Sequence, residues 1–465
     1  MVTGLFENCF PQWLRQLIVR LNSSRKIAVI YDDNPHFDSV LGLLSVSLLS
    51  GEGSGAGLRN AEKAVEKGLV GLVADILNES TWEKERYLHC LKIVERLSEH
   101  APAAANQFFD KSTHTYLMKN IRDAMLVYKK NNDLCEADAG KDDEKSLPRK
   151  YITLAAEIDS LGALLNSDDP HRRYEVLSKP LVDDMLSILR HYRTDPVLLT
   201  ALCRFAKAYF SCEEVKQMPD LIVKVEKTQS LTQLVPYLGL KKYEELLKMA
   251  RRYQQGGEGA GESDKFIQFQ HLDDPVVHGL FIAIVQLMSF FCEEAANDSD
   301  NDGSVFELVS KALNESSRET ALFNCIEVPN DDLKLAVVEC LYNVSLAEFD
   351  SEELTQIVKV LSSCKNIGAG KTELVLAKLF WILTKLTKDE EEDSGKTFRL
   401  KFGEKAVKEA CEILARNMSR QIDEAEEDEE HEKLSLSLSC LHFLKFVSVN
   451  PDTKKYLLNK HEQLK

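Results

Sequence analysis

Three aspartates spaced two residues apart, Asp298, Asp300 and Asp302, have the residue types of a calcium-binding loop. In such a loop, carboxylates at positions 1, 3 and 5 supply oxygen ligands, and a glycine at position 6, present here, permits the sharp turn. Position 12 should supply a bidentate glutamate, but Val309 stands there. The three aspartates are therefore candidate metal ligands, with an acidic loop as the preferred interpretation. A calcium-responsive protein acting through residues 298–309 stays an alternative.

The segment 367–372, IGAGKT, ends like a phosphate-binding loop. The complete pattern requires a glycine at position 365, where the chain has Lys365, and a buried strand directly before the loop. The residues before it have a helical pattern instead. The segment is therefore interpreted as a turn with Lys371 near a helix start, and no nucleotide cofactor is predicted.

Histidines and cysteines do not form a recognisable catalytic or metal-binding motif. The sequence has no H-E-x-x-H and no C-x-x-C. His89 and Cys90 are neighbours on a predicted helix and point in different directions, so they are not a nucleophile–base pair. Cys440 and His442 are excluded as such a pair for the same reason. The sequence predicts no catalytic residue, no cofactor and no enzymatic activity.

Composition narrows the partners and the compartment. The net charge is −17, from 75 acidic and 58 basic residues, which disfavours nucleic acids and anionic membranes. No apolar run is long enough to cross a membrane. Eleven scattered cysteines, an odd number, are typical of free thiols in a reducing compartment. We expect a cytoplasmic protein, with the nucleus or the cytoskeleton as alternatives, whose partners are proteins that carry a basic or helical segment.

Apolar residues recur with a helical period between polar breaks. Some segments, such as 333–344 and 374–386, are apolar nearly all round, and a helix of that kind must be packed between other helices. The best boundaries are the polar or glycine-rich stretches 131–148 and 254–265. The predicted segments are N-terminal helices at 1–130, middle helices at 149–253, and C-terminal helices with acidic insertions at 266–465.

Asparagine or aspartate precedes proline at five places, a pairing typical of helix starts. These are Asn34-Pro35, Asp169-Pro170, Asp195-Pro196, Asp274-Pro275 and Asn450-Pro451. Residues 434–447 begin with a strand-like alternation, but their apolar continuation and helical surroundings favour a helix. Charged stretches, among them 388–396, are interpreted as loops.

Several segments resemble armadillo units, in which a glycine precedes a short amphipathic helix and a long buried helix follows. The clearest are 66–77 with 85–109, and 331–363, where Leu341-Tyr342-Asn343 matches the family's asparagine step. Unit starts near 332 and 373 lie about 41 residues apart, within the armadillo/HEAT period. The Trp-x-x-x-Asn ladder of the nuclear-import adaptors is missing, because Trp381 is followed by Lys385.

The resemblance implies an all-α, armadillo/HEAT-like right-handed α-solenoid. It also implies a non-enzymatic scaffold or adaptor that binds a segment of a partner protein along the solenoid groove. A regulatory subunit of a larger enzyme complex is the alternative function. Individual groove residues, the partner and homo-oligomerisation are not predicted from the sequence.

Overall fold

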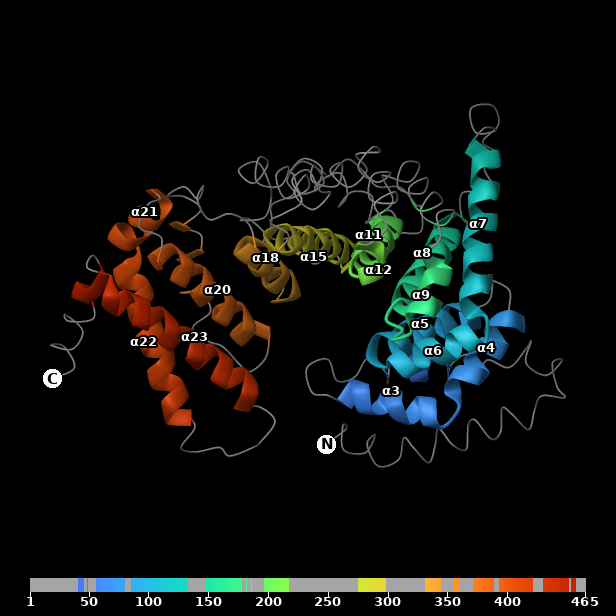
Figure 1. Ribbon diagram of the computed structural model, residues 1–465, viewed down its shortest axis with the longest axis horizontal. Coiled ribbons are helices and arrows are strands. Elements are labelled where there is room, and N and C mark those ends of the chain that lie inside the picture. The colour runs from blue at the N-terminus through green and yellow to red at the C-terminus, as the bar shows by residue number, and fades with distance from the viewer. Residues whose placement is uncertain are drawn as a thin grey trace, which may run out of the picture. The chain divides into compact units, whose positions relative to one another are not determined.

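All secondary structure in the described part of the chain is helical, as Figure 1 shows, and this confirms the predicted all-α class. The computed structural model describes residues 41–45, 48, 56–79, 85–132, 147–177, 181, 185, 196–216, 275–297, 331–343, 354–355, 357–358, 361, 371–388, 393–420, 430–450 and 453–456. Among the described helices, none is both long and apolar enough to cross a membrane.

The chain divides into two compact units. The first contains residues 1–230 and 252–259, and the second contains residues 231–251 and 260–465. The three segments predicted from the polar breaks are not tested by this division and stay a prediction. Each unit is described below by itself.

In the first unit, the long helix α8 packs against α5 on one side and against α11 on the other. Shorter helices and α7 pack against this row. The described helices of the unit are α3 (Ala56–Glu66), α4 (Leu69–Glu79), α5 (Glu85–His100), α6 (Pro102–Asp110), α7 (Thr113–Asn132), α8 (Leu147–Leu164), α9 (Pro170–Val176), α11 (Pro196–Phe210) and α12 (Glu213–Lys216).

The described helices of the second unit contain a similar row of packed helices. Helix α18 packs against α15 and α20, and α20 packs in turn against α23. The described helices are α15 (Pro275–Asn297), α18 (Asp331–Asn343), α20 (Lys371–Lys388), α21 (Asp393–Lys401), α22 (Gly403–Arg420) and α23 (Glu430–Val449).

The predicted helix starts are confirmed wherever the structure describes them. Helices α9, α11 and α15 begin at Pro170, Pro196 and Pro275. At α9, the Asp169 carboxylate accepts a hydrogen bond from the His171 backbone N–H at 3.0 Å, so it caps the helix. Gly68, with φ of 81°, ends the turn before α4, a backbone conformation that favours glycine. Local sequence therefore determines where these helices begin.

Two other local predictions have opposite outcomes. Residues 434–447 are helical, as predicted, and lie within α23. The prediction of a loop at 388–396 is wrong in its second half, because α21 begins at Asp393. The fully buried Phe398 of α21 anchors this short helix in the core although its first turn is polar.

Buried polar side chains link the helices of the first unit. The Tyr87 hydroxyl of α5 donates to the Glu157 carboxylate of α8 at 2.5 Å. The Asn120 side chain of α7 donates to both groups, at 2.9 and 3.2 Å. Tyr87 is 0% exposed and Glu157 is 4% exposed, so a substrate cannot reach this triad. Its role is to fix three helices in one register.

In the second unit, α20 is covered by neighbours on both sides, as a helix that is apolar all round requires. Phe380 of α20 meets Phe443 of α23 with ring centroids 5.6 Å apart, and both side chains are fully buried. On α18, the Asn343 amide of the armadillo-like step donates to the Ser289 hydroxyl of α15 at 3.1 Å. This asparagine links two successive long helices.

We expect Phe443→Ala to lower the free energy of unfolding by about 3–5 kcal/mol, because it leaves a cavity against Phe380. Leu438→Ala, on the exposed side of the same helix, should change it by less than about 0.5 kcal/mol. Urea unfolding followed by circular dichroism measures both. Equal losses for the two variants would contradict the assigned orientation of α23.

Candidate functional site

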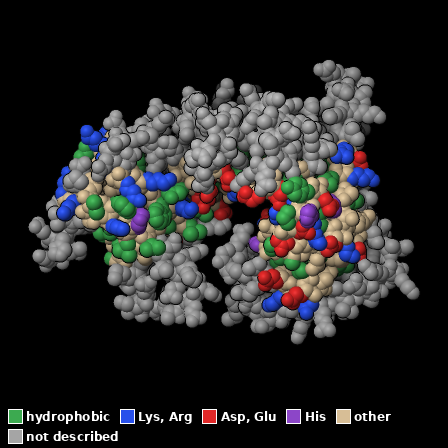
Figure 2. All heavy atoms as spheres, viewed as in Figure 1, with side chains coloured by type: hydrophobic (Ala, Val, Ile, Leu, Met, Phe, Trp, Pro, Cys, Tyr) green, Lys and Arg blue, Asp and Glu red, His purple; other side chains and the backbone are tan. Residues whose placement is uncertain are grey.

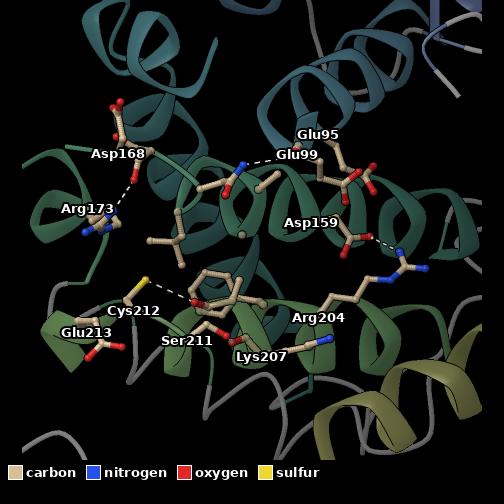
Figure 3. Close-up of a pocket in the computed structure, with 17 residues that line it drawn as sticks. Glu95, Glu99, Asp159, Asp168, Arg173, Arg204, Lys207, Ser211, Cys212 and Glu213 are labelled. Carbon is tan, nitrogen blue, oxygen red and sulfur yellow. Dashed lines mark hydrogen bonds and ion pairs between the residues drawn. The ribbon is translucent and has the colours of Figure 1, made fainter. Parts of the chain in front are cut away.

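A groove in the first unit runs across the row formed by α5, α8 and α11 (Figure 3). Its volume is about 780 Å³. Helix α5 contributes Glu95 and Glu99 at one end of the groove, and α8 and α11 contribute Asp159 and Arg204. The loop after α8 and the turn after α11 line the other end.

Helix α11 packs closely on α8 at Gly162, beneath the groove. A methyl group at this position would lie 3.4 Å from the Cα atom of Phe205. The ring of Phe205 is 4% exposed and forms the apolar floor between the two helices. The groove is therefore built on a rigid helix–helix contact.

Carboxylates outnumber cations at the α5 end. Arg204 donates to one oxygen of Asp159 at 3.2 Å, and Arg96 donates to Glu99 at 3.0 Å. Among the described residues, Glu95 has no ion-pair partner, and the second oxygen of Asp159 has no hydrogen-bond partner. Figure 3 shows Glu95, Glu99 and Asp159 together above Arg204.

This environment disfavours negative charge on two of the carboxyl groups. Burial, and then the charge of Asp159, raises the pKa of Glu95 to about 7. Burial raises the pKa of Asp159 to about 6, although Arg204 opposes this change. A cation placed between the two groups would favour their ionised forms, so the arrangement is suited to bind positive charge.

The opposite end of the groove is held by Arg173 of α9. Its guanidinium donates to the Glu214 carboxylate at 2.5 and 3.1 Å and also to the Ser167 carbonyl oxygen. Burial alone would raise the pKa of Glu214, but the hydrogen bonds from Arg173 outweigh it and lower the pKa. Because this pair satisfies itself, it positions the groove wall and leaves little charge for a ligand.

The one cysteine among the groove residues is not activated. Cys212 donates its thiol to the Ala208 carbonyl oxygen at 3.4 Å and is 7% exposed. Burial raises its pKa to about 11. The group stays a thiol at neutral pH, and a thiol is a poor nucleophile. The groove is therefore better suited to recognition than to covalent chemistry.

None of the motifs singled out in the sequence is among the described residues that line this groove. Asp298, Asp300 and Asp302 lie outside the described residues, as do residues 367–370. Lys371 is the first residue of α20, which confirms the interpretation of a helix start. In the described part of the chain, no group of three or more histidine, cysteine, aspartate or glutamate residues could hold a metal ion.

The groove residues themselves were missed from the sequence. Glu157 and Asp159 are two carboxylates in the mostly apolar stretch 152–164 of α8, and carboxylates at such positions are a signal worth noting. Glu95 and Glu99 are like charges four residues apart, which destabilise an isolated helix. Only the packing of α5 on α8 shows that these signals belong to one site.

Comparisons with known proteins do not assign the chain to a family. No family model matches it, and no curated protein matches it. The crystal structure of an engineered protein aligns with 92% of this chain and 98% of its own length, at 12% identity. The TM-score of that alignment is 0.29, which is too low for an argument about fold or function.

The raised pKa of Glu95 predicts a pH-dependent loss of stability. An unfolded chain ionises this group near pH 4.5, whereas the folded chain retains the proton up to about pH 7. The folded state binds more protons in this window, so stability falls as the pH rises through it. We expect Glu95→Gln to gain about 1–2 kcal/mol relative to the wild type between pH 5 and pH 8.

Urea unfolding of both proteins at the two pH values measures this difference, and the titrations of groups remote from Glu95 cancel. Glu62→Gln, at an exposed position of α3, is the control and should show no pH-dependent difference from the wild type. A gain for Glu95→Gln that is the same at pH 5 and pH 8 would contradict the prediction.

Proposed function

We propose that this chain is a non-enzymatic scaffold whose first unit binds a basic segment of another protein in the groove of α5, α8 and α11. The observation that carries the proposal is the pair Glu95 and Asp159, two incompletely neutralised carboxyl groups on adjacent helices that line an open groove. A lysine or arginine of a partner would supply the missing positive charge.

The order of helix contacts supports an armadillo/HEAT-like solenoid. In the first unit α8 packs between α5 and α11, and in the second α18 packs between α15 and α20 while α20 packs between α18 and α23. Contacts of this nearest-neighbour kind are typical of repeat proteins. In such proteins the exposed sides of successive long helices form an extended binding surface.

The groove has room for an extended segment. Neighbouring packed helices lie about 8–10 Å apart, so three of them span about 20 Å. An extended chain advances about 3.3 Å per residue, and about six residues would cross the row. With carboxylates at the α5 end and the Phe205 floor in the middle, the preferred segment carries a basic residue followed by a small apolar one.

Fluorescence anisotropy with a labelled peptide of alternating lysine and alanine tests the proposal on the full chain. We expect the double variant Glu95→Gln/Asp159→Asn to bind the peptide about tenfold more weakly than the wild type, because two charge contacts are lost. Binding to the wild type should also weaken from pH 8 to pH 5.5, as Glu95 and Asp159 take up protons.

The matched control is Glu62→Gln/Asp123→Asn, which removes two exposed carboxylates from α3 and α7. Its affinity should equal that of the wild type. If the groove variant and the control bind the peptide equally, attraction by the overall negative charge would explain binding and the groove would have no part in it.

A further inference from the structure

The second unit has a surface of a different chemical kind over α20 and α23. Figure 2 shows hydrophobic side chains gathered with lysines in this region. We call it the lysine–aromatic face and define it by Trp381, Lys385 and Lys388 on α20, and by Leu438, Leu441, His442, Lys445, Phe446 and Val449 on α23.

Helix α23 is apolar on its exposed side as well as on its buried side. Leu438, Leu441 and Val449 are 60%, 55% and 75% exposed. Their spacings of three and eight residues place them on one side of the helix, about 16 Å from end to end. Three large apolar side chains in one row on the surface indicate a contact site.

Lysines and aromatic rings border this apolar row. Lys388 lies 4.1 Å from the ring centroid of Phe446, and Lys445 lies 5.8 Å from the same ring. Trp381 of α20 contacts His442 of α23, with ring centroids 4.5 Å apart. These contacts hold two positive charges at fixed places beside the apolar row, so less side-chain entropy is lost on binding.

The positive charge of this border is not neutralised within the described residues. Lys378 pairs with Glu339 at 3.8 Å, but Lys385, Lys388 and Lys445 contact aromatic rings and form no ion pair there. Partial burial, and then the charges of Lys388 and Lys445, lowers the pKa of His442. Within the described residues, these three lysines therefore add unpaired positive charge beside the apolar row.

From this combination we propose that the lysine–aromatic face binds an acidic amphipathic helix of another protein. The apolar side of that helix packs along Leu438, Leu441 and Val449, and its carboxylates pair with Lys388 and Lys445. The row is long enough for the anchors of a bound helix, because positions i and i+7 of a helix lie only about 10.5 Å apart along its axis. This surface is independent of the groove in the first unit.

Charge disfavours the two other possible occupants of this apolar face, which are a second copy of the chain and an anionic membrane. A second copy bound through a two-fold axis would set this face against itself and bring the exposed lysines of both copies together. An anionic membrane would attract the lysines but would meet the net charge of −17 on the rest of the chain. An acidic helix satisfies both the apolar row and the lysines.

The test uses the full chain and a labelled synthetic helix with leucines at spacings of three and four and glutamates beside them. In fluorescence anisotropy, the wild type should bind this peptide. Lys388→Glu/Lys445→Glu and Leu438→Ser/Leu441→Ser should each bind it at least about tenfold more weakly. All four positions are exposed, so circular dichroism should show that both variants stay folded.

The matched control is Lys119→Glu/Lys405→Glu, which makes the same charge change at exposed positions of α7 and α22 and should bind like the wild type. The proposal is overturned if the acidic peptide does not bind at millimolar concentration, or if a lysine-for-glutamate version binds equally well. It is also overturned if Leu438→Ser/Leu441→Ser abolishes a dimer seen by light scattering, or abolishes binding to phosphatidylserine vesicles instead.

Discussion

The structure depends on long helices that are apolar around most of their circumference and must be covered on two sides. Helix α8 is covered by α5 and α11, and α20 by α18 and α23. Burying a large aliphatic or aromatic side chain contributes about 1.5–3 kcal/mol. The central helices carry many such side chains, for example Leu161 on α8 and Phe380 on α20. The same constraint places α5, α8 and α11 in one row and α15, α18, α20 and α23 in another, because each central helix needs a neighbour on both sides.

Polar side chains then decide the register of these helices. Apolar packing alone tolerates sliding, since many arrangements bury similar areas, whereas a buried hydrogen bond has one geometry. Tyr87 and Asn120 share the Glu157 carboxylate across three helices. Asn166 donates to the Ser98 carbonyl oxygen at the end of α5, and Asn343 reaches Ser289 in the other unit. Both units therefore use short polar links between successive helices.

The two proposed binding surfaces use residues that the packing of the helices does not need. In the first unit these are carboxylates on α5 and α8, whose partial burial opposes their own ionisation. In the second unit they are lysines held over aromatic rings, beside exposed leucines. The partners proposed for the two surfaces therefore have opposite charges. The net charge of −17 does not show this contrast, because it sums carboxylates and lysines over the whole chain.

The sequence by itself determined what depends on neighbouring residues: the all-α class, the helix starts at Pro170, Pro196 and Pro275, and the helix at 434–447. Helix periodicity and N-capping act over a few residues, so a single sequence contains them. Tertiary structure decided that Glu95 lies beside Asp159, 64 positions away in the chain, and that Trp381 meets His442. Burial and pairing of side chains arise only when helices pack together, so a single sequence does not contain them. Helix α21 also depends on tertiary structure, because burial of Phe398 in the core stabilises it.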